Sequence, residues 1–240
     1  MTAAIRMLAY GMLADFMDES LRIEETTAIK SLKKFVKAVV SIFFEEYLRS
    51  PNNNDIARLL AVGQHCGFPG MLGSIDCMHW KWKSCPRSHN DINVLKRSSV
   101  FSELVERHAP PINYLINGND YSMGYYLADG IYPSWATFVK TIPAPQDHKR
   151  QHFASAQEAV RKDVERAFGV LQVRFAIVCR PTHFFHLETL KDIMMACIIL
   201  HNMIVEDERH TYLGANDFDY DQIDNNGLES MSHNPTCNLM

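Results

Sequence analysis

A single acidic residue, Asp76, interrupts an otherwise apolar segment at residues 71–82. The segment follows a cluster of structure-breaking residues, Gly67-Phe68-Pro69-Gly70, and its composition is typical of a buried β-strand. An acid in a strand that is buried on both faces is costly unless it is paired or bound to a metal ion. Asp76 therefore constrains both the fold and the chemistry of the chain.

Strands and helices alternate between residues 67 and 205. Strands are predicted at residues 71–82, 112–117 and 123–128, with a tight turn at Gly118-Asn119-Asp120, and residues 135–142 are compatible with a strand or a short helix. Helices are predicted after Asn90, from beyond Asp147, and at residues 187–205. This alternation is typical of an α/β fold, in which a sheet packs against helices.

Residues 1–66 are predicted to form a helical annex beside this core. Apolar residues recur at helical spacing from residue 26 to about residue 48, and a shorter helix follows the loop at residues 51–55. The polar face of the longer helix carries lysines at i, i+3, i+4 and i+7, namely Lys30, Lys33, Lys34 and Lys37. This lysine stripe is compatible with an ordinary solvated surface and with phosphate contacts.

The net charge of −4 is unevenly distributed along the chain. Residues 206–240 hold eight acidic side chains and one basic one, which leaves 23 basic and 20 acidic side chains, a net +3, in residues 1–205. A mildly basic body permits a nucleic-acid partner without requiring one. Residues 206–240 are predicted to be an acidic disordered tail, so the predicted domains are residues 1–66, 67–205 and 206–240.

No run of about 18 uncharged apolar residues is present, and the first residues lack the pattern of a secretory signal. The six cysteines do not form a paired framework, which suits reduced thiols. We therefore expect a soluble protein of the cytosol or nucleus.

Three carboxylates are predicted to lie where α/β sheets carry functional groups, at strand ends and on helix surfaces that face the sheet. Asp76 lies in the first strand, Asp129 directly follows the strand at residues 123–128, and Glu165 lies beside the buried face of a long helix. Converging carboxylates suit Mg²⁺, which prefers oxygen ligands. However, Asp129 is also compatible with a hairpin turn, and Glu165 with an ion pair to Arg161 four residues earlier.

Other polar residues have two interpretations each. Asp91 is an acid that we expect to cap the helix following it. Lys81 and Lys83 alternate with two tryptophans, which is compatible with phosphate contacts and base stacking or with a packed tryptophan pair. His201 and Asn202 fall in an apolar helix and are expected to be buried polar groups of the core.

Four blocks of the sequence resemble those of Harbinger-type plant DDE transposases. The blocks are residues 67–79 (GFPGMLGSIDCMH), 125–133 (YYLADGIYP), 163–169 (DVERAFG) and 200–203 (LHNM), and the likeness covers about residues 2–210. The resemblance implies an RNase H-like fold in which Asp76, Asp129 and Glu165 are the catalytic metal ligands for Mg²⁺ or Mn²⁺. The 35 residues between Asp129 and Glu165 are a typical spacing for such enzymes. It further implies a nuclear, metal-dependent DNA endonuclease or transposase, with DNA and a separate Myb-like DNA-binding protein as partners.

The chain also departs from the pattern that this resemblance implies. Family members carry two more antiparallel strands between the first acid and the block that matches residues 90–95. Here only residues 83–89 separate the first strand from that block, and two strands of about five residues with their turns do not fit there. We therefore expect a shortened copy whose mixed sheet is incomplete and has an exposed edge.

Two hypotheses about function follow. In the first, Asp76, Asp129 and Glu165 bind two metal ions, and water or a DNA 3′-hydroxyl attacks a phosphodiester, with activity impaired by the missing segment. In the second, the chain is a catalytically inert module that binds DNA or the Myb-like partner. A decayed copy that does not fold is a third hypothesis. The first is favoured because all three acids are retained.

Overall fold

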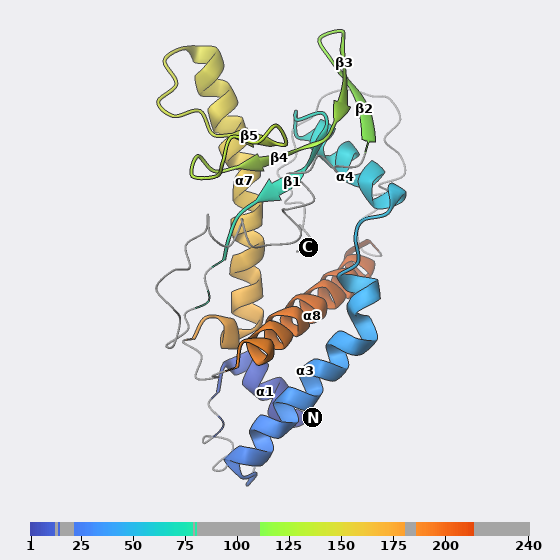
Figure 1. Cartoon of the computed structure of the whole chain (residues 1–240), viewed down its shortest axis with the longest axis vertical. Coiled ribbons are helices and arrows are strands. Elements are labelled where there is room, and N and C mark those ends of the chain that lie inside the picture. Colours follow the sequence, from blue (N-terminus) through green and yellow to red (C-terminus); the bar gives the residue numbers. More distant parts are fainter. Residues whose placement is uncertain (13, 15–21, 79, 81–110, 181–185, 214–240) are drawn as a thin grey trace. The chain divides into compact units, whose positions relative to one another are not determined.

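The fold is seen in a computed structural model that describes residues 1–12, 14, 22–78, 80, 111–180 and 186–213 (Figure 1). The predictions for Lys81, Lys83, the helix after Asp91 and the tail from residue 214 onward lie outside the described residues. The chain mixes helices with small sheets, as predicted from the alternation of strands and helices.

The described residues form two compact units. The helical unit comprises residues 1–49, Trp80 and the residues from 167 onward, and the sheet unit comprises residues 50–78 and 111–166. Helix α7 (His148–Arg174) contributes to both. The predicted domain boundaries, at residues 66 and 205, stay a prediction.

In the helical unit, α3 (Glu25–Tyr47) packs along α8 (Leu187–Leu213), and α1 (Thr2–Tyr10) packs against α3 and the 3₁₀-helix η1 (Ala176–Val178) (Figure 1). The residues that α3 buries follow helical spacing, namely Ala28, Leu32, Val36 and Val39. The prediction of a helix over residues 26–48 is confirmed.

Helix α8 is longer than predicted. The expected end at Val205 is wrong, because the helix runs through residues 206–209 to Leu213. Contacts to other elements of the helical unit account for the extension: Glu206 accepts a hydrogen bond from the Tyr47 hydroxyl at 2.7 Å, and Glu208 pairs with Arg174 at 2.5 Å. Tertiary contacts therefore order acidic residues that composition assigns to a tail.

The sheet unit begins with α4 (Asn53–His65), which starts earlier than predicted, because its cap is Asn52 and residues 53–55 of the expected loop are helical. The Asn52 side chain accepts hydrogen bonds from the N–H groups of Asn54 and Asp55, and the Asp55 carboxylate accepts one from the Asn52 N–H. This reciprocal capping box satisfies N–H groups that the first helical turn leaves unpaired. The helix packs against β1 (Met71–Ile75).

The main sheet has three parallel strands in the order β1, β4 (Tyr125–Ala128), β5 (Phe138–Lys140). Residues 135–142, which the sequence leaves open between strand and helix, thus contain a strand. The first strand is shorter than predicted, because it ends at Ile75 and Asp76 follows it. Within the part of the chain that the structure describes, β1 pairs with β4 alone, so β1 is an edge strand of this sheet.

Strands β2 (Pro111–Ile116) and β3 (Asn119–Met123) form a separate antiparallel hairpin. Its turn is Asn117-Gly118, with φ values of 51° and 81°, which is the type I′ geometry that suits Asn-Gly. The predicted turn was therefore placed one residue late. The predicted single strand over residues 123–128 is also wrong, because Gly124 separates β3 from β4. A Cβ on Gly124 would lie 2.6 Å from Leu72 Cδ1, so only glycine fits this junction without a shift.

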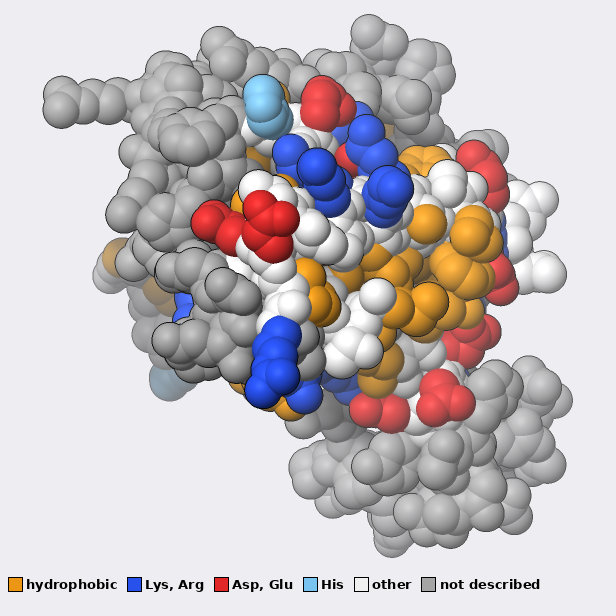
Figure 2. Space-filling model, turned by 90° about the horizontal axis from the view of Figure 1, so that it is seen from below, with side chains coloured by type: hydrophobic (Ala, Val, Ile, Leu, Met, Phe, Trp, Pro, Cys, Tyr) orange, Lys and Arg blue, Asp and Glu red, His pale blue; other side chains and the backbone are white. Residues whose placement is uncertain are grey.

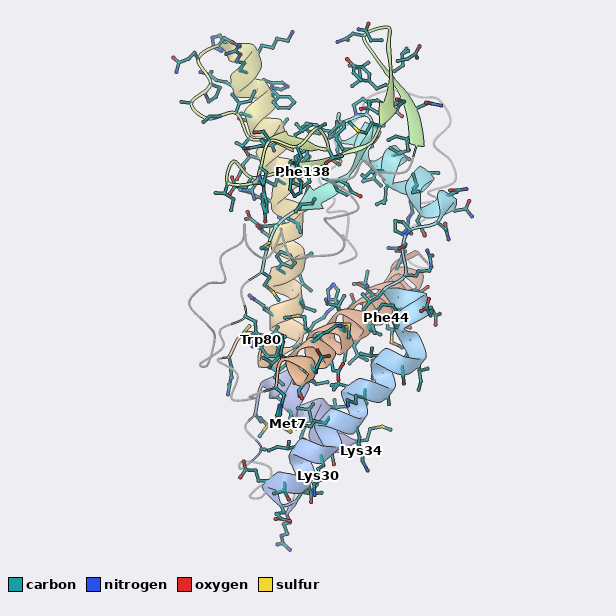
Figure 3. The ribbon with its side chains drawn as sticks, viewed as in Figure 1. Met7, Lys30, Lys34, Phe44, Trp80 and Phe138 are labelled. Atoms are coloured by element: carbon teal, nitrogen blue, oxygen red, sulfur yellow. The ribbon has the colours of Figure 1, made fainter. Side chains whose placement is uncertain are left out.

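Successive residues of the short strands pack on opposite faces of the sheet. Leu127 and Met71 pack against α7 through Phe153, Ala156 and Val160. On the other face, Ala128 and Ile75 pack with Tyr132 and Phe138. Figure 3 labels Phe138 in this second cluster. Because both faces of β4 are covered, the turn that follows Ala128 is held in a fixed position.

Candidate functional site

Asp76 and Asp129 lie at the carboxyl ends of neighbouring parallel strands. Ile75 of β1 and Ala128 of β4 are register partners, so each aspartate is the next residue after a paired position. The carboxyl ends of parallel strands are where α/β sheets collect functional groups. The hairpin interpretation of Asp129 is wrong, because the strand that follows, β5, runs parallel to β4.

A backbone N–H holds one oxygen of each aspartate. Asp76 Oδ1 accepts a hydrogen bond from the Cys77 N–H at 2.8 Å, and Asp129 Oδ1 accepts one from the Gly130 N–H at 2.5 Å. Such contacts to the following residue restrict rotation of a short acidic side chain. Both carboxylates are therefore oriented by the turn that each of them begins.

The charges of Asp129 and Glu165 act on the Asp76 carboxyl. Partial burial raises the pKa of the Asp76 carboxyl above its ordinary value, while the Cys77 N–H and the Arg161 guanidinium act to lower it. The negative charges of Glu165 and Asp129 raise it further. We call Asp76, Asp129 and Glu165 the acid cluster, because the charges of the last two act on the first although the residues lie far apart in the sequence.

Glu165 lies on α7 and forms an ion pair with an arginine of the same helix. Its Oε1 lies 2.8 Å from Arg161 Nη1, one helical turn earlier, and 45% of the Glu165 side chain is exposed. The ion pair with Arg161, which was the alternative interpretation of Glu165, is therefore present. Arg161 itself is buried, with 10% of its side chain exposed, and it also pairs with Glu158.

Burial acts to lower the pKa of the Arg161 guanidinium, but its acidic neighbours outweigh burial and raise it. The largest acidic contribution comes from Glu158, followed by Glu165 and Asp129. Arg161 is thus a permanently charged group that faces acidic residues from its own helix and from the end of β4.

A second buried polar residue of α7, Gln157, is fully buried and was not predicted from the sequence. Its side-chain amide donates to the carbonyl oxygens of Ala128 and Val139, each at 3.3 Å, and its Oε1 accepts from the Thr141 hydroxyl at 3.0 Å. Because Ala128 directly precedes Asp129, this side chain ties α7 to the strand end that carries an acid. The only signal in the sequence is a polar residue near an apolar stripe, which is common on helices.

The donor chemistry of the acid cluster suits a hard divalent cation, since all three predicted ligands are carboxylates. However, among the residues that the structure describes, no three His, Cys, Asp or Glu side chains are grouped closely enough to hold a metal ion. Glu165 is instead directed to Arg161. The assignment of the three acids as metal ligands stays a prediction.

The lysine stripe of α3 lies in the helical unit. Lys30, Lys34 and Lys37 are exposed and Lys33 is half-buried. Figure 3 labels Lys30 and Lys34 on the N-terminal half of α3. Figure 2 shows Lys and Arg side chains next to an apolar area on one face of the molecule. The same helix exposes an apolar residue, Ile42, at 67%.

His201 and Asn202 are buried in α8, as predicted. Asn202 Nδ2 donates to the Tyr47 carbonyl at 3.3 Å, and His201 Nδ1 lies 3.4 Å from Arg174 Nη1. Both therefore serve packing of the helical unit. None of the helices in the described ranges has the length and apolar character needed to cross a bilayer.

The fold and the acid cluster define an α/β protein with carboxylates at the ends of adjacent parallel strands. Comparison with protein families identifies a match to the family described as plant transposon protein, over residues 45–89 and 85–212. The match covers more than half of the chain, and the protein belongs to this transposase-related plant family. No curated protein and no solved structure matches the chain.

Proposed function

We propose that the protein descends from a Harbinger-type DDE transposase and acts on DNA as a metal-dependent endonuclease or strand-transfer enzyme in the nucleus. The observation that carries the proposal is the placement of Asp76 and Asp129 after register partners of two adjacent parallel strands. Glu165, on the helix tied to the same strand end, supplies the third carboxylate. Membership of the plant transposon protein family supports the DNA substrate.

An RNase H-like core is part of this proposal. The parallel order β1, β4, β5 supports it, as does the outer edge of β1, which pairs with no strand among the described residues. That edge is where the two additional family strands belong. The family match is also split into two segments that meet at residues 85–89, within the region where those strands are expected.

In the proposed reaction, residues of the chain orient the site and supply its negative charge. The attacking group is water or a DNA 3′-hydroxyl. The backbone N–H groups after Asp76 and Asp129 hold both carboxylates in place, and Gln157 fixes the helix that carries Glu165. The three acids would hold Mg²⁺ or Mn²⁺, which supplies Lewis-acid stabilisation and acidifies bound water. Attack at phosphorus forms one P–O bond and breaks another; the attacking hydroxyl loses a proton and the leaving oxygen gains one.

DNA binding is proposed to use more than the acid cluster. The exposed lysines of α3 carry positive charge at a spacing suited to phosphates, and Lys81 and Lys83 are further candidates from the sequence. The body of the chain is only mildly basic, so a Myb-like partner protein is proposed to contribute affinity for DNA.

A nicking assay on supercoiled plasmid with Mn²⁺ tests the proposed chemistry. We expect the protein to nick, and Asp129→Asn to lose more than the tenfold to hundredfold that is typical of residues which only orient metal ligands. Asp120→Asn, the same substitution on the exposed strand β3, is the matched control and should retain activity. Equal nicking by Asp129→Asn and the unsubstituted protein would overturn the proposal.

One observation favours the inert-module alternative. In the described part of the chain, no three potential ligands are grouped at metal-binding distance. An inert module predicts no nicking with Mg²⁺ or Mn²⁺, together with DNA binding that Asp129→Asn leaves unchanged. Measuring plasmid binding beside plasmid nicking therefore separates the two functions.

A further inference from the structure

A pocket of about 570 Å³ lies in the sheet unit, between the β2–β3 hairpin and the main sheet. Five of the side chains that line it are aromatic, namely Phe68, Tyr114, Tyr121, Tyr125 and Phe153. Of the described residues that line it, none belongs to the acid cluster. Pockets of this size with mainly apolar and aromatic walls hold a small molecule or one planar part of a larger ligand.

The tyrosine rings of the hairpin are fixed in orientation. Tyr114 and Tyr121 are register partners, and their rings stack with centroids 5.4 Å apart and planes 15° apart. The Tyr114 hydroxyl donates a hydrogen bond to the Met123 carbonyl at 3.1 Å, which anchors that ring at its far end. Tyr121, the second ring of the pair, is 45% exposed. A rigid pair with one accessible ring binds a planar ligand at low cost in conformational entropy.

The charge of the pocket decides which part of a nucleotide it suits. Asp120 is the only charged side chain among the described residues that line the pocket. A phosphate group would be repelled by this carboxylate, whereas an uncharged base can stack on the aromatic rings. Membership of a transposon-protein family supports DNA as the source of the planar group.

We propose that this pocket binds an unpaired base of a DNA strand, which stacks on the accessible Tyr121 ring, with the Tyr114 ring as its support. A base inside a duplex is covered by its neighbours, so the pocket accepts a base only where the strand is unpaired, as at a strand end. This inference rests on the proposed function, because it takes DNA as the ligand. The contact requires no metal ion.

A purely structural role for the two tyrosines makes a different prediction. Aromatic pairs directly opposite each other stabilise antiparallel strands by themselves. In that case, removing the Tyr121 ring would lower the stability of the hairpin and leave any preference for unpaired bases unchanged. The effect of the substitution on base preference therefore decides between the two roles.

The test is the affinity of the full chain, in EDTA, for two fluorescein-labelled duplexes with 3′-overhangs of equal length, measured by fluorescence anisotropy. One overhang carries adenines and the other carries abasic sites, so the two share their phosphates and differ in their bases. The adenine overhang should bind about fivefold or more tightly, which is the lower end of the range for stacking one base on an aromatic side chain. Tyr121→Ala should abolish this preference, and Tyr121→Phe, which keeps the ring, should retain it.

Tyr10→Ala is the matched control. It removes another accessible tyrosine, which is 63% exposed at the end of α1 in the helical unit. This variant should keep the preference for the adenine overhang. If Tyr10→Ala reduces the preference as much as Tyr121→Ala does, the pocket is not the binding site and the inference fails.

A second variant covers the case in which Tyr121→Ala does not fold, as judged by its circular dichroism spectrum. Tyr121→Leu keeps an apolar side chain on β3 and removes the ring. Loss of the preference in this variant supports stacking. A retained preference overturns it.

The outcomes separate this inference from the proposed function, because binding is measured without metal and nicking with it. If the unsubstituted protein binds both overhangs equally, or binds neither, the base pocket is overturned, and plasmid nicking decides the proposed function independently. Equal binding would leave the tyrosines as an apolar surface for contact with a protein. If the protein prefers the adenine overhang but does not nick, the base pocket stands and the nuclease activity fails alone.

Discussion

The side-chain amide of Gln157 donates a hydrogen bond to the main-chain carbonyl of Ala128, the residue immediately before Asp129. A second bond from the same amide reaches Val139 in the neighbouring strand. One fully buried side chain thus joins α7, which carries Glu165, to the end of the strand that carries a second acid. This contact holds the helix of Glu165 against the strand end that precedes Asp129.

Gln157→Leu should lower the free energy of unfolding by about 2–4 kcal/mol, because it removes the hydrogen bonds of a buried amide to Ala128, Val139 and Thr141. Urea unfolding followed by circular dichroism measures the change. Gln64→Leu, on the exposed face of α4, is the control and should stay within about 0.5 kcal/mol. An equal loss in both variants would show that the buried amide has no special role.

Asp76→Asn should raise the stability of the metal-free protein at neutral pH. Burial raises the pKa of the folded Asp76 carboxyl above its unfolded value, so its ionised form opposes folding. That cost is absent at low pH and appears as pH rises through the folded pKa. Thermal unfolding with EDTA at pH 3 and pH 7 checks this: the two proteins should differ at pH 7 and converge at pH 3. A less stable variant at pH 7 would contradict the prediction.

The helical unit should lose stability below about pH 6.5. Burial lowers the pKa of His201, the Arg174 charge lowers it further, and Glu208 acts in the opposite direction. The unfolded imidazole therefore binds a proton at a pH where the folded one does not, and stability falls as pH drops through the unfolded pKa of about 6.5. Urea midpoints between pH 5.5 and 7.5 should decline for the unsubstituted protein and decline less for His201→Gln. Parallel curves for the two would refute the assignment.

Gly70→Ala should destabilise the sheet unit more than Gly67→Ala. Both glycines have φ near +80°, which costs a substituted alanine roughly 1–2 kcal/mol. At Gly70 a Cβ would also lie 2.3 Å from the Tyr114 ring, whereas nothing lies within 4 Å at Gly67. Urea unfolding of both variants isolates the steric contribution, expected to be a further 1–3 kcal/mol or so. Equal losses would mean that Tyr114 moves aside freely.

Local signals in the sequence predicted much of this fold. Helical periodicity located α3 and predicted α4, although α4 begins inside the expected Asn-rich loop, at Asn53. Errors arose where a distant contact decides the outcome. The extension of α8 depends on Tyr47 and Arg174, neither of which is near residues 206–208 in the sequence.

In the candidate site, too, the features with local sequence signals were predicted and those that depend on distant contacts were not. The sequence predicts that Asp129 ends a strand and that Glu165 has Arg161 as a neighbour, because both features are local. It does not reveal Gln157, whose strand partners are 29 and 18 residues away. A contact between residues so far apart in the sequence produces no periodic pattern from which it could be predicted.

The Arg161–Glu165 pair also bears on when the contacts of α7 form during folding. A carboxylate whose charge acts on other carboxylates is destabilising unless a positive charge offsets it. Here the positive charge that offsets Glu165 lies on the same helix. Because the two partners lie one helical turn apart, their pairing needs no contact from elsewhere in the chain and can form as soon as the helix does.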